Sequence, residues 1–384
     1  MKHCVIALIL LPLATLADNT APRARDLGIP FEGAPGPLNA ITDVPGVTVG
    51  HSTIIADYEN GSAARAGVTA ILPRGEDSIM TPVFAGTAVL NGAGEMTGNI
   101  WVEASGFLEG PVMLTTTQSV GMVFEETIKW RVKHAERDIT GYAWSDPVVA
   151  ETWGGRLNDE NGFYVRPEHV YEAIESAKSG PVAEGNVGGG TGMVCYQFKC
   201  GIGTASRIVE TEDGTYTVAA LVQANYGWRE ILMIAGVPVG RELPVAQAAD
   251  TWVPTHDEMG SIIVVIATDA PLLPHQLKRV ATRAGLGIAR NGGMASNGSG
   301  DIFIAFSTAN NTELRSGANL SARLLGNEQI TPVFTGAVLA TEEAIVNALV
   351  AARTMTGFEG NTVEAIDHDA LRVVLRKYNR LVED

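Results

Sequence analysis

The sequence contains little cysteine and little positive charge. Its 384 residues include 3 cysteines, and 27 Lys and Arg residues stand against 43 Asp and Glu, for a net charge of −16 at pH 7. No basic block offers a surface for a phosphate backbone, so we do not expect nucleic-acid binding. Only Cys195 and Cys200 lie beyond the first 17 residues, which excludes a disulfide scaffold.

Metal-binding patterns are also missing from the sequence. The 7 histidines form no His-x-x-x-His or His-Glu-x-x-His group, and Cys195 and Cys200 have no histidine partner. These cysteines are 5 positions apart, which would place their side chains on opposite faces of one strand. We therefore expect no essential metal, no cofactor, and no local disulfide unless a turn separates the two cysteines.

The first 17 residues are typical of a signal peptide. A weakly basic start precedes the apolar stretch Cys4–Leu16, and Thr15-Leu16-Ala17 is a small-residue cleavage signal. The apolar stretch is too short to span a bilayer comfortably, although a retained N-terminal anchor is the alternative. We expect a periplasmic or secreted protein that begins at residue 18 and has no membrane attachment after the signal is removed.

The rest of the chain alternates loosely between strand-like and helix-like segments. Short β-branched runs predict strands at Val47–Val49, Gly67–Leu72, Val112–Thr117, Gly201–Val209, Tyr216–Val222, Ser261–Thr268 and Asp301–Phe306. Apolar residues at three-to-four spacing predict helices at Ser119–Glu136, Pro167–Ala177, His275–Ala289 and Thr341–Met355. The lack of strict alternation favours α+β packing, sheet on sheet with helices outside, over a doubly wound parallel sheet.

The junction Gly260-Ser261 is the most informative feature of the chain. It follows a connector, residues 235–259, that is rich in proline and acid and longer than an ordinary connection. Glycine has no Cβ to shield its carbonyl, so the next hydroxyl can attack it. Cleavage would leave an N-terminal serine whose amine, with a pKa of about 7.7–8, can act as a base. The alternative is that Ser261 only opens a buried strand.

Polar residues elsewhere could support such a nucleophile. Ser299 and Asp301 are two apart on a predicted strand and so face the same way, although a hairpin turn is the alternative. Asn225 ends an apolar run and could donate to an oxyanion, unless it only forms a turn. Glu151 lies two residues before Trp153, so it could hold a substrate ammonium against an aromatic wall. Its alternative is a solvated loop acid.

Two common catalytic patterns are absent. The sequence has no Gly-x-Ser-x-Gly elbow of the usual serine hydrolases. The glycine-rich segment Gly188–Cys195 lacks the lysine and hydroxyl residue of a phosphate loop, and a strand-like run follows it. We expect this segment to pack closely around a site instead of binding phosphate.

Several ordered segments together resemble the β-aminopeptidase family, which includes the L-aminopeptidase/D-amidase-esterases. The segments are Asp43–Thr53, Gly92–Gly98, Pro147–Asp159, Gly188–Arg207, Val222–Gly227, Met259–Ser261 and Asn297–Phe306. The resemblance extends from about Arg23 to the C-terminus. It implies one hydrolase domain, residues 18–384, folded as a four-layer α-β-β-α sandwich like the N-terminal-nucleophile hydrolases. It also implies self-cleavage into chains 18–260 and 261–384, and assembly into a homotetramer.

The resemblance assigns a role to each candidate residue. It implies Ser261 as nucleophile, Ser299 and Asp301 as its polar support, Asn225 as oxyanion donor and Glu151 near the substrate amine. The family often has tyrosine where this chain has Trp153. Because Trp153 has no phenolic hydroxyl, the roles that remain for it are stacking or shaping the pocket. The family acid at position 301 can also be glutamate, which differs in reach but not in charge.

The expected function is that of an exported, self-processing serine aminopeptidase. It would release N-terminal residues from short peptides, amides or esters through an acyl-enzyme on Ser261. A periplasmic small-molecule binding protein is an alternative, which predicts neither cleavage nor turnover. An acyltransferase of the same fold is another, but the self-cleaving ornithine acetyltransferases use threonine at the cut and normally lack export signals.

Overall fold

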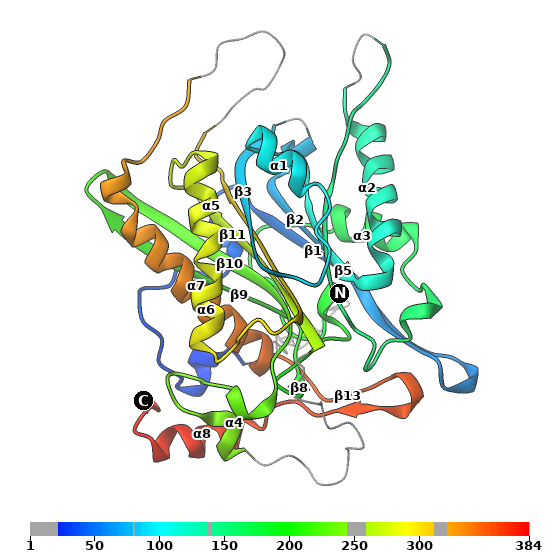
Figure 1. Cartoon of the computed structure of the whole chain (residues 1–384), viewed down its shortest axis with the longest axis vertical. Coiled ribbons are helices and arrows are strands. Elements are labelled where there is room, and N and C mark those ends of the chain that lie inside the picture. Colours follow the sequence, from blue (N-terminus) through cyan, green and yellow to red (C-terminus); the bar gives the residue numbers. More distant parts are fainter. Residues whose placement is uncertain (1–21, 80, 137–139, 244–258, 311–320, 384) are drawn as a thin grey trace, which may run out of the picture.

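Two β-sheets lie face to face at the centre of the molecule. The computed structural model describes residues 22–79, 81–136, 140–243, 259–310 and 321–383 (Figure 1). The predicted signal peptide and most of the predicted connector lie outside these ranges.

The smaller sheet has four strands in the order β1-β2-β5-β6. These are β1 (Thr48–Asp57), β2 (Ala63–Glu76), β5 (Val112–Thr116) and β6 (Val148–Thr152). Neighbours are antiparallel except β5 and β6, which run parallel. The carboxyl ends of β5 and β6 therefore lie at the same edge of the sheet.

The larger sheet has six strands in the order β4-β3-β12-β11-β10-β9. These are β4 (Phe107–Leu108), β3 (Val83–Gly92), β12 (Gly298–Ser307), β11 (Met259–Thr268), β10 (Gly214–Asn225) and β9 (Ile202–Thr211). Only β11 and β12 are parallel. The strand that begins with the predicted cleavage site thus lies between two long neighbours.

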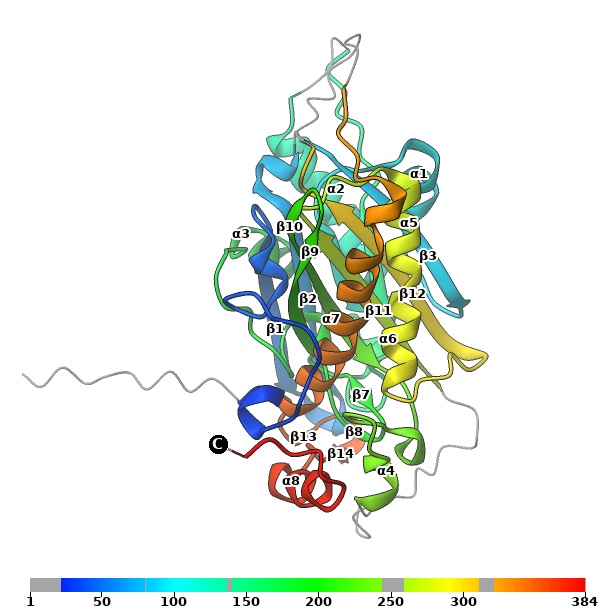
Figure 2. The same ribbon diagram turned by 90° about the vertical axis from the view of Figure 1, so that its left-hand side faces the viewer.

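Helices cover the outer face of each sheet, as Figures 1 and 2 show. α2 (Val120–His134) and α3 (Pro167–Glu175) pack on the smaller sheet. α5 (Pro274–Thr282), α6 (Ala284–Arg290) and α7 (Thr331–Val350) lie on the side of the larger sheet. This arrangement confirms the predicted four-layer α-β-β-α sandwich.

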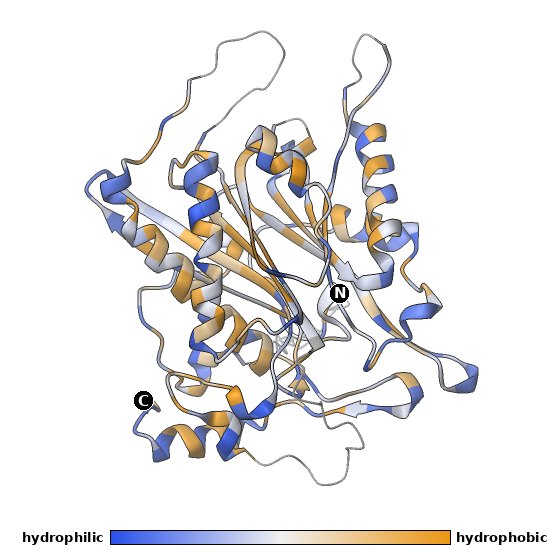
Figure 3. Cartoon of the chain, viewed as in Figure 1, coloured by the Kyte–Doolittle hydropathy of each residue, from blue (hydrophilic) through white to orange (hydrophobic). Residues whose placement is uncertain are grey.

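The alternation of side chains along β11 explains its unbroken apolar sequence. Ile262 and Val264 belong to the core between the larger sheet and its helices, whereas Ile263 and Val265 belong to the core between the sheets. A strand buried on both faces needs apolar residues at every position. Figure 3 shows the same pattern as largely hydrophobic strands under helices of mixed hydropathy.

Helix α7 is the one described helix whose length and composition would suit a membrane span. It lies in the core of the molecule, packed against β9 and β10. Of the most apolar stretch of this helix, 83% is buried. We therefore assign it to the core.

Several elements differ from the sequence-based expectation. The helix predicted at 275–289 is two helices, α5 and α6, and α7 begins at Thr331, well before the predicted start. The strands β3 and β6 were not predicted. Part of the predicted irregular connector is ordered, because α4 (Val239–Glu242) lies within it. The remaining unpredicted helices are α1 (Asn99–Ser105) and α8 (His368–Lys377), and the remaining unpredicted strands are the two-residue strands β4, β7 (Val194–Cys195), β8 (Phe198–Lys199), β13 (Met355–Thr356) and β14 (Thr362–Val363).

The two cysteines form a disulfide because a turn separates them, which is the exception that the sequence left open. Cys195 ends the short strand β7 (Val194–Cys195), and Cys200 directly follows its partner strand β8 (Phe198–Lys199). The Cα atoms of the two cysteines lie 5.5 Å apart. The turn between the strands is Tyr196-Gln197, with φ of 53° and 61°. Tyrosine and glutamine rarely adopt this left-handed conformation, so the turn has no local sequence signal.

Candidate active site

Ser261 lies at the start of β11 with its hydroxyl against the carbonyl of the preceding residue. The Oγ atom donates a hydrogen bond to the Gly260 carbonyl oxygen at 2.6 Å and accepts one from the Gly300 amide at 3.3 Å. The residue is only 4% exposed. The hydroxyl therefore contacts the peptide bond at which the sequence predicts cleavage, in a buried site where one backbone amide, that of Gly300, also points to it.

Gly260 is glycine because β10 leaves no room for a side chain. A Cβ atom there would lie 2.3 Å from the Asn225 carbonyl oxygen and 2.8 Å from the Tyr226 Cα. Both are backbone atoms, so they could move only by separating the strands. Close packing against β10 therefore adds a second reason for glycine at the junction, beside the open carbonyl.

Asn225 ends β10 directly opposite Ser261 in the antiparallel register. Opposite residues in such a pair point to the same face of the sheet, which brings the side-chain amide to the nucleophile's side. Its Nδ2 donates to the Trp153 carbonyl at 2.8 Å, and its Oδ1 accepts from the Val194 amide at 2.8 Å. An amide group has two N–H bonds, so one remains for an oxyanion.

Ser299 and Asp301 face the same way on β12, as their spacing predicts. The Ser299 hydroxyl donates to Asp301 Oδ1 at 3.0 Å, and both residues are fully buried. Ser299 pairs with Gly260 in the parallel register, and Gly300 pairs with Ser261. The hydroxyl and carboxylate therefore come from the residues on either side of Gly300, whose amide reaches Ser261.

Glu151 lies near the end of β6 and is 4% exposed. One carboxylate oxygen accepts a hydrogen bond from the Glu95 amide at 3.1 Å, and the other accepts from the Thr117 hydroxyl. Burial raises the pKa of this carboxyl, and the charges of Glu160 and Glu95 raise it further, against the two hydrogen bonds. The solvated loop acid considered as an alternative is thus excluded.

Gly94 lies between Glu151 and Gly300, the residue whose amide reaches Ser261. A Cβ atom at Gly94 would lie 3.1 Å from Glu151 Oε1 and 3.3 Å from the Gly300 Cα. The backbone of this loop therefore separates the carboxylate from the strand whose amide reaches Ser261. Glu151 and Gly300 thus pack against Gly94 from different sheets, and the Gly300 amide in turn reaches Ser261.

Trp153 contributes both its ring and its backbone to this site. The residue is 37% exposed, and a Cβ at Gly155 would lie 2.3 Å from the indole, so the ring rests on the Gly155 backbone. Its carbonyl oxygen is the acceptor for Asn225 Nδ2. The sequence suggested stacking or pocket shape, but it could not show the backbone contact.

Sequence reasoning missed three polar residues around the site. Glu160 accepts from the Gly154 amide at 3.0 Å and from the Thr116 hydroxyl, and burial raises its pKa. Asn91 donates to the Ser299 carbonyl at 2.5 Å, and Thr117 binds Glu151. Two of them adjoin segments that carry the family resemblance, because Glu160 directly follows Pro147–Asp159 and Asn91 directly precedes Gly92–Gly98.

Around the site, the residues that the structure describes form no metal centre. Within the described ranges, no group of three or more His, Cys, Asp or Glu side chains is placed to hold a metal ion. The chemistry available in this part of the chain is that of a hydroxyl, carboxylates, an amide side chain and backbone N–H groups.

Comparisons with known proteins identify the family of this chain. Residues 39–363 match the model of peptidase family S58. Over 383 residues the chain is 52% identical to the β-peptidyl aminopeptidase BapA of Sphingosinicella microcystinivorans, covering 96% of each protein.

Two solved structures share the fold at high identity. One is the L-aminopeptidase D-Ala-esterase/amidase of Ochrobactrum anthropi, described as a prototype for the serine aminopeptidases and a new variant of the Ntn-hydrolase fold. It matches with a TM-score of 0.87 and 50% identity, over 94% of this chain and 99% of that one. The other is a β-aminopeptidase of Burkholderia sp., with a TM-score of 0.84 and 46% identity over 93% and 99% of the chains.

These similarities confirm the predicted family and the predicted enzyme class. The binding-protein and acyltransferase alternatives gain no support from them. The chain belongs to peptidase family S58 and is a serine aminopeptidase with a variant of the Ntn-hydrolase fold.

Proposed function

We propose that the protein activates itself by cutting the Gly260–Ser261 bond. Ser261 Oγ attacks the Gly260 carbonyl carbon, the C–N bond breaks as an ester forms, and the proton moves to the nitrogen. Water then hydrolyses the ester and leaves chains 18–260 and 261–384. The hydrogen bond of 2.6 Å between Oγ and the scissile carbonyl supports this step.

We propose that the same hydroxyl then attacks the substrate carbonyl. An acyl-enzyme forms on Ser261, the amine or alcohol leaves, and water releases the N-terminal residue. The Gly300 amide and Asn225 Nδ2 would stabilise the oxyanion, because both lie beside Ser261 on the flanking strands. Each such donor typically contributes roughly 2.7–4 kcal/mol to the chemical step.

The new α-amine of Ser261 is our candidate base. Ser299 and Asp301 would balance its charge and relay its proton, since direct transfer between the amine and hydroxyl of one residue is geometrically strained. Support comes from the register, which places Ser299 opposite the glycine that departs on cleavage.

Glu151 and Trp153 would select substrates with a free amino terminus. A buried carboxylate pairs well with an ammonium group and offers nothing to a blocked one. Because the similar proteins are named β-peptidyl aminopeptidase and β-aminopeptidase, we propose an N-terminal β-amino acid residue as the preferred group. Short peptides, amides and esters are the substrate classes.

We also propose export and self-association. Residues 1–17 support a periplasmic or secreted location for the mature protein. Val89, Leu90 and Ile100 are 56, 54 and 83% exposed around a cavity of about 750 Å³, and this apolar surface supports self-association. The number of subunits that we propose, four, rests on the family resemblance.

The position of the Ser261 hydroxyl, between the Gly260 carbonyl and the Gly300 amide, carries the proposed mechanism. The test is to quench the enzyme with acid during turnover of a slowly hydrolysed β-alanyl ester and to map the acylated peptide by mass spectrometry. The proposal predicts the acyl group on Ser261. Acylation at another residue, with Ser261 unmodified, would contradict it.

A further inference from the structure

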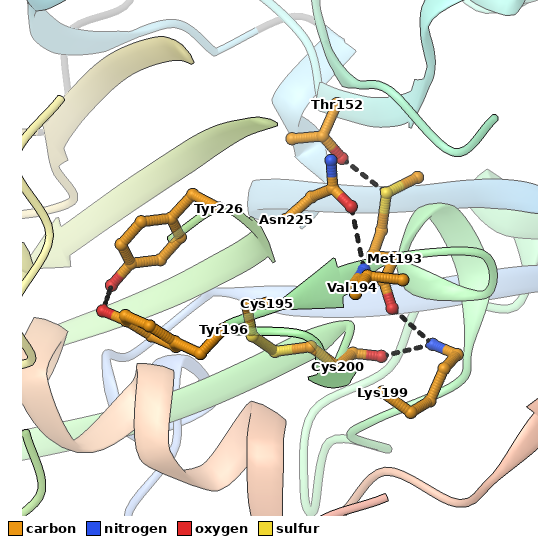
Figure 4. The surroundings of a disulfide bond; sticks show 9 residues. All are labelled: Thr152, Met193, Val194, Cys195, Tyr196, Lys199, Cys200, Asn225 and Tyr226. Carbon is orange, nitrogen blue, oxygen red and sulfur yellow. Dashed lines mark hydrogen bonds between the residues drawn. A yellow bond between two sulfur atoms is a disulfide. The ribbon is translucent and has the colours of Figure 1, made fainter. Parts of the chain in front are cut away.

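The disulfide hairpin of residues 193–200 lies directly behind Asn225 (Figure 4). Its two short strands are joined by the Tyr196-Gln197 turn and cross-linked by the cysteines. Tyr196 ties it to the residue after Asn225, because the Tyr196 amide donates to the Tyr226 carbonyl at 2.8 Å and the two hydroxyls lie 2.9 Å apart. The hairpin is therefore anchored to the end of β10.

A buried lysine holds the two ends of this hairpin together. Lys199 is fully buried, and its Nζ donates to the Met193 carbonyl at 2.8 Å and the Cys200 carbonyl at 2.5 Å (Figure 4). Burial lowers the pKa of this amine well below its usual value. The two carbonyl oxygens satisfy N–H donors of this amine, which would otherwise be buried without partners.

The clamped segment provides the hydrogen bond that orients Asn225. Val194 follows Met193, and its amide donates to Asn225 Oδ1. This bond fixes which end of the side-chain amide faces the hairpin. Nδ2 must then face the opposite way, toward the Trp153 carbonyl and the nucleophile's side of the sheet. A rotated amide would present an acceptor where the oxyanion needs a donor.

We propose that Lys199 is a positioning residue for the oxyanion donor and acts through the Val194 amide on Asn225. The inference rests on the proposed oxyanion role of Asn225. The hairpin needs rigidity because a small displacement of a preorganised donor already costs rate. The hydrogen bonds of Lys199 and the disulfide both supply that rigidity.

A double-mutant cycle between Lys199→Met and Asn225→Ala tests this role. Methionine keeps the length of the side chain and removes its donors, and Lys377→Met, whose side chain is 61% exposed, is the matched control. On processed enzyme we expect Lys199→Met to lower kcat about 10–100-fold with KM unchanged, since misplacing a group by 1 Å can cost about 100-fold. In the Asn225→Ala background the same substitution should change kcat less than about twofold.

The pair Cys195→Ala/Cys200→Ala is the second variant, because it loosens the hairpin while keeping the buried lysine. This pair tests the role of the hairpin even if Lys199→Met fails to fold. It should lower kcat less than Lys199→Met does, and that loss should again nearly disappear in the Asn225→Ala background. If the hairpin substitutions lowered kcat by the same factor with and without Asn225, the proposed role of the hairpin would be wrong. The proposed oxyanion role of Asn225 would not be affected by that result. If Asn225→Ala alone kept full kcat, the proposed oxyanion role would fail instead.

Discussion

Replacing Glu151 by glutamine removes one charge and almost no volume. The amide oxygen can still accept from the Glu95 amide, and the Thr117 hydroxyl can reverse to accept from the new NH₂ group. The site geometry should therefore survive. The substitution removes a charge-assisted hydrogen bond to the substrate ammonium, which contributes about 1.5–3 kcal/mol. Its loss should lower kcat/KM roughly 10–100-fold.

The assay compares two anilides of one acid, with and without the amino group. Wild type should prefer the aminated substrate, and Glu151→Gln should lose about 10–100-fold on that substrate alone. Glu125→Gln, on an exposed part of α2, is the matched control. Equal losses on both anilides, or no loss on either, would refute the assignment of Glu151 to the amine.

The pH dependence gives a second measure of the same residue. Burial raises the pKa of Glu151, so its carboxylate takes up a proton at a higher pH than an exposed glutamate. KM for the aminated anilide should therefore rise as the pH falls in wild type and stay flat in Glu151→Gln. Since the folded state binds this proton more tightly than the unfolded chain, ionised Glu151 destabilises the fold at neutral pH. The variant should accordingly melt no earlier than wild type at pH 7.

Three further outcomes follow from the packing. Gly260→Ala places a Cβ 2.3 Å from a backbone oxygen of β10, so self-cleavage should slow markedly on a denaturing gel; cleavage at the wild-type rate would contradict this packing. Glu343→Gln removes the carboxylate that lies 2.7 Å from the buried Arg207 guanidinium, so the free energy of unfolding should fall by about 3–5 kcal/mol. Urea denaturation measures this loss, and an unchanged midpoint would contradict the prediction. Denatured, unreduced mature protein should take up no iodoacetamide at the hairpin cysteines and two equivalents after reduction; labelling before reduction would exclude the disulfide.

The layered fold could be predicted because local patterns determine it. The apolar runs at Ser261–Thr268 and Asp301–Phe306 became β11 and β12, and the two-residue spacing of Ser299 and Asp301 correctly placed both side chains on one face. Strand alternation needs only the sequence near each residue. The same logic placed Asn225 at the end of its strand.

The assembly of the site could not be predicted in this way. The Asn225–Ser261 register joins two strands across a long connection, and no local pattern specifies it. The contact between Asn225 and the Trp153 carbonyl uses a backbone atom, which any residue would supply. The hairpin behind Asn225 depends on a turn at Tyr196 and Gln197, whose side chains give no turn signal. The features that the sequence did not predict are therefore those that depend on pairing between distant strands or on backbone atoms.

The intact mass of active enzyme, measured beside a Ser261→Ala variant, tests the central claim most directly. Active wild type should contain two polypeptides, one of which begins at Ser261, and the variant should remain one uncut, inactive chain. Active material with an unbroken Gly260–Ser261 bond, or a cut variant, would contradict the account.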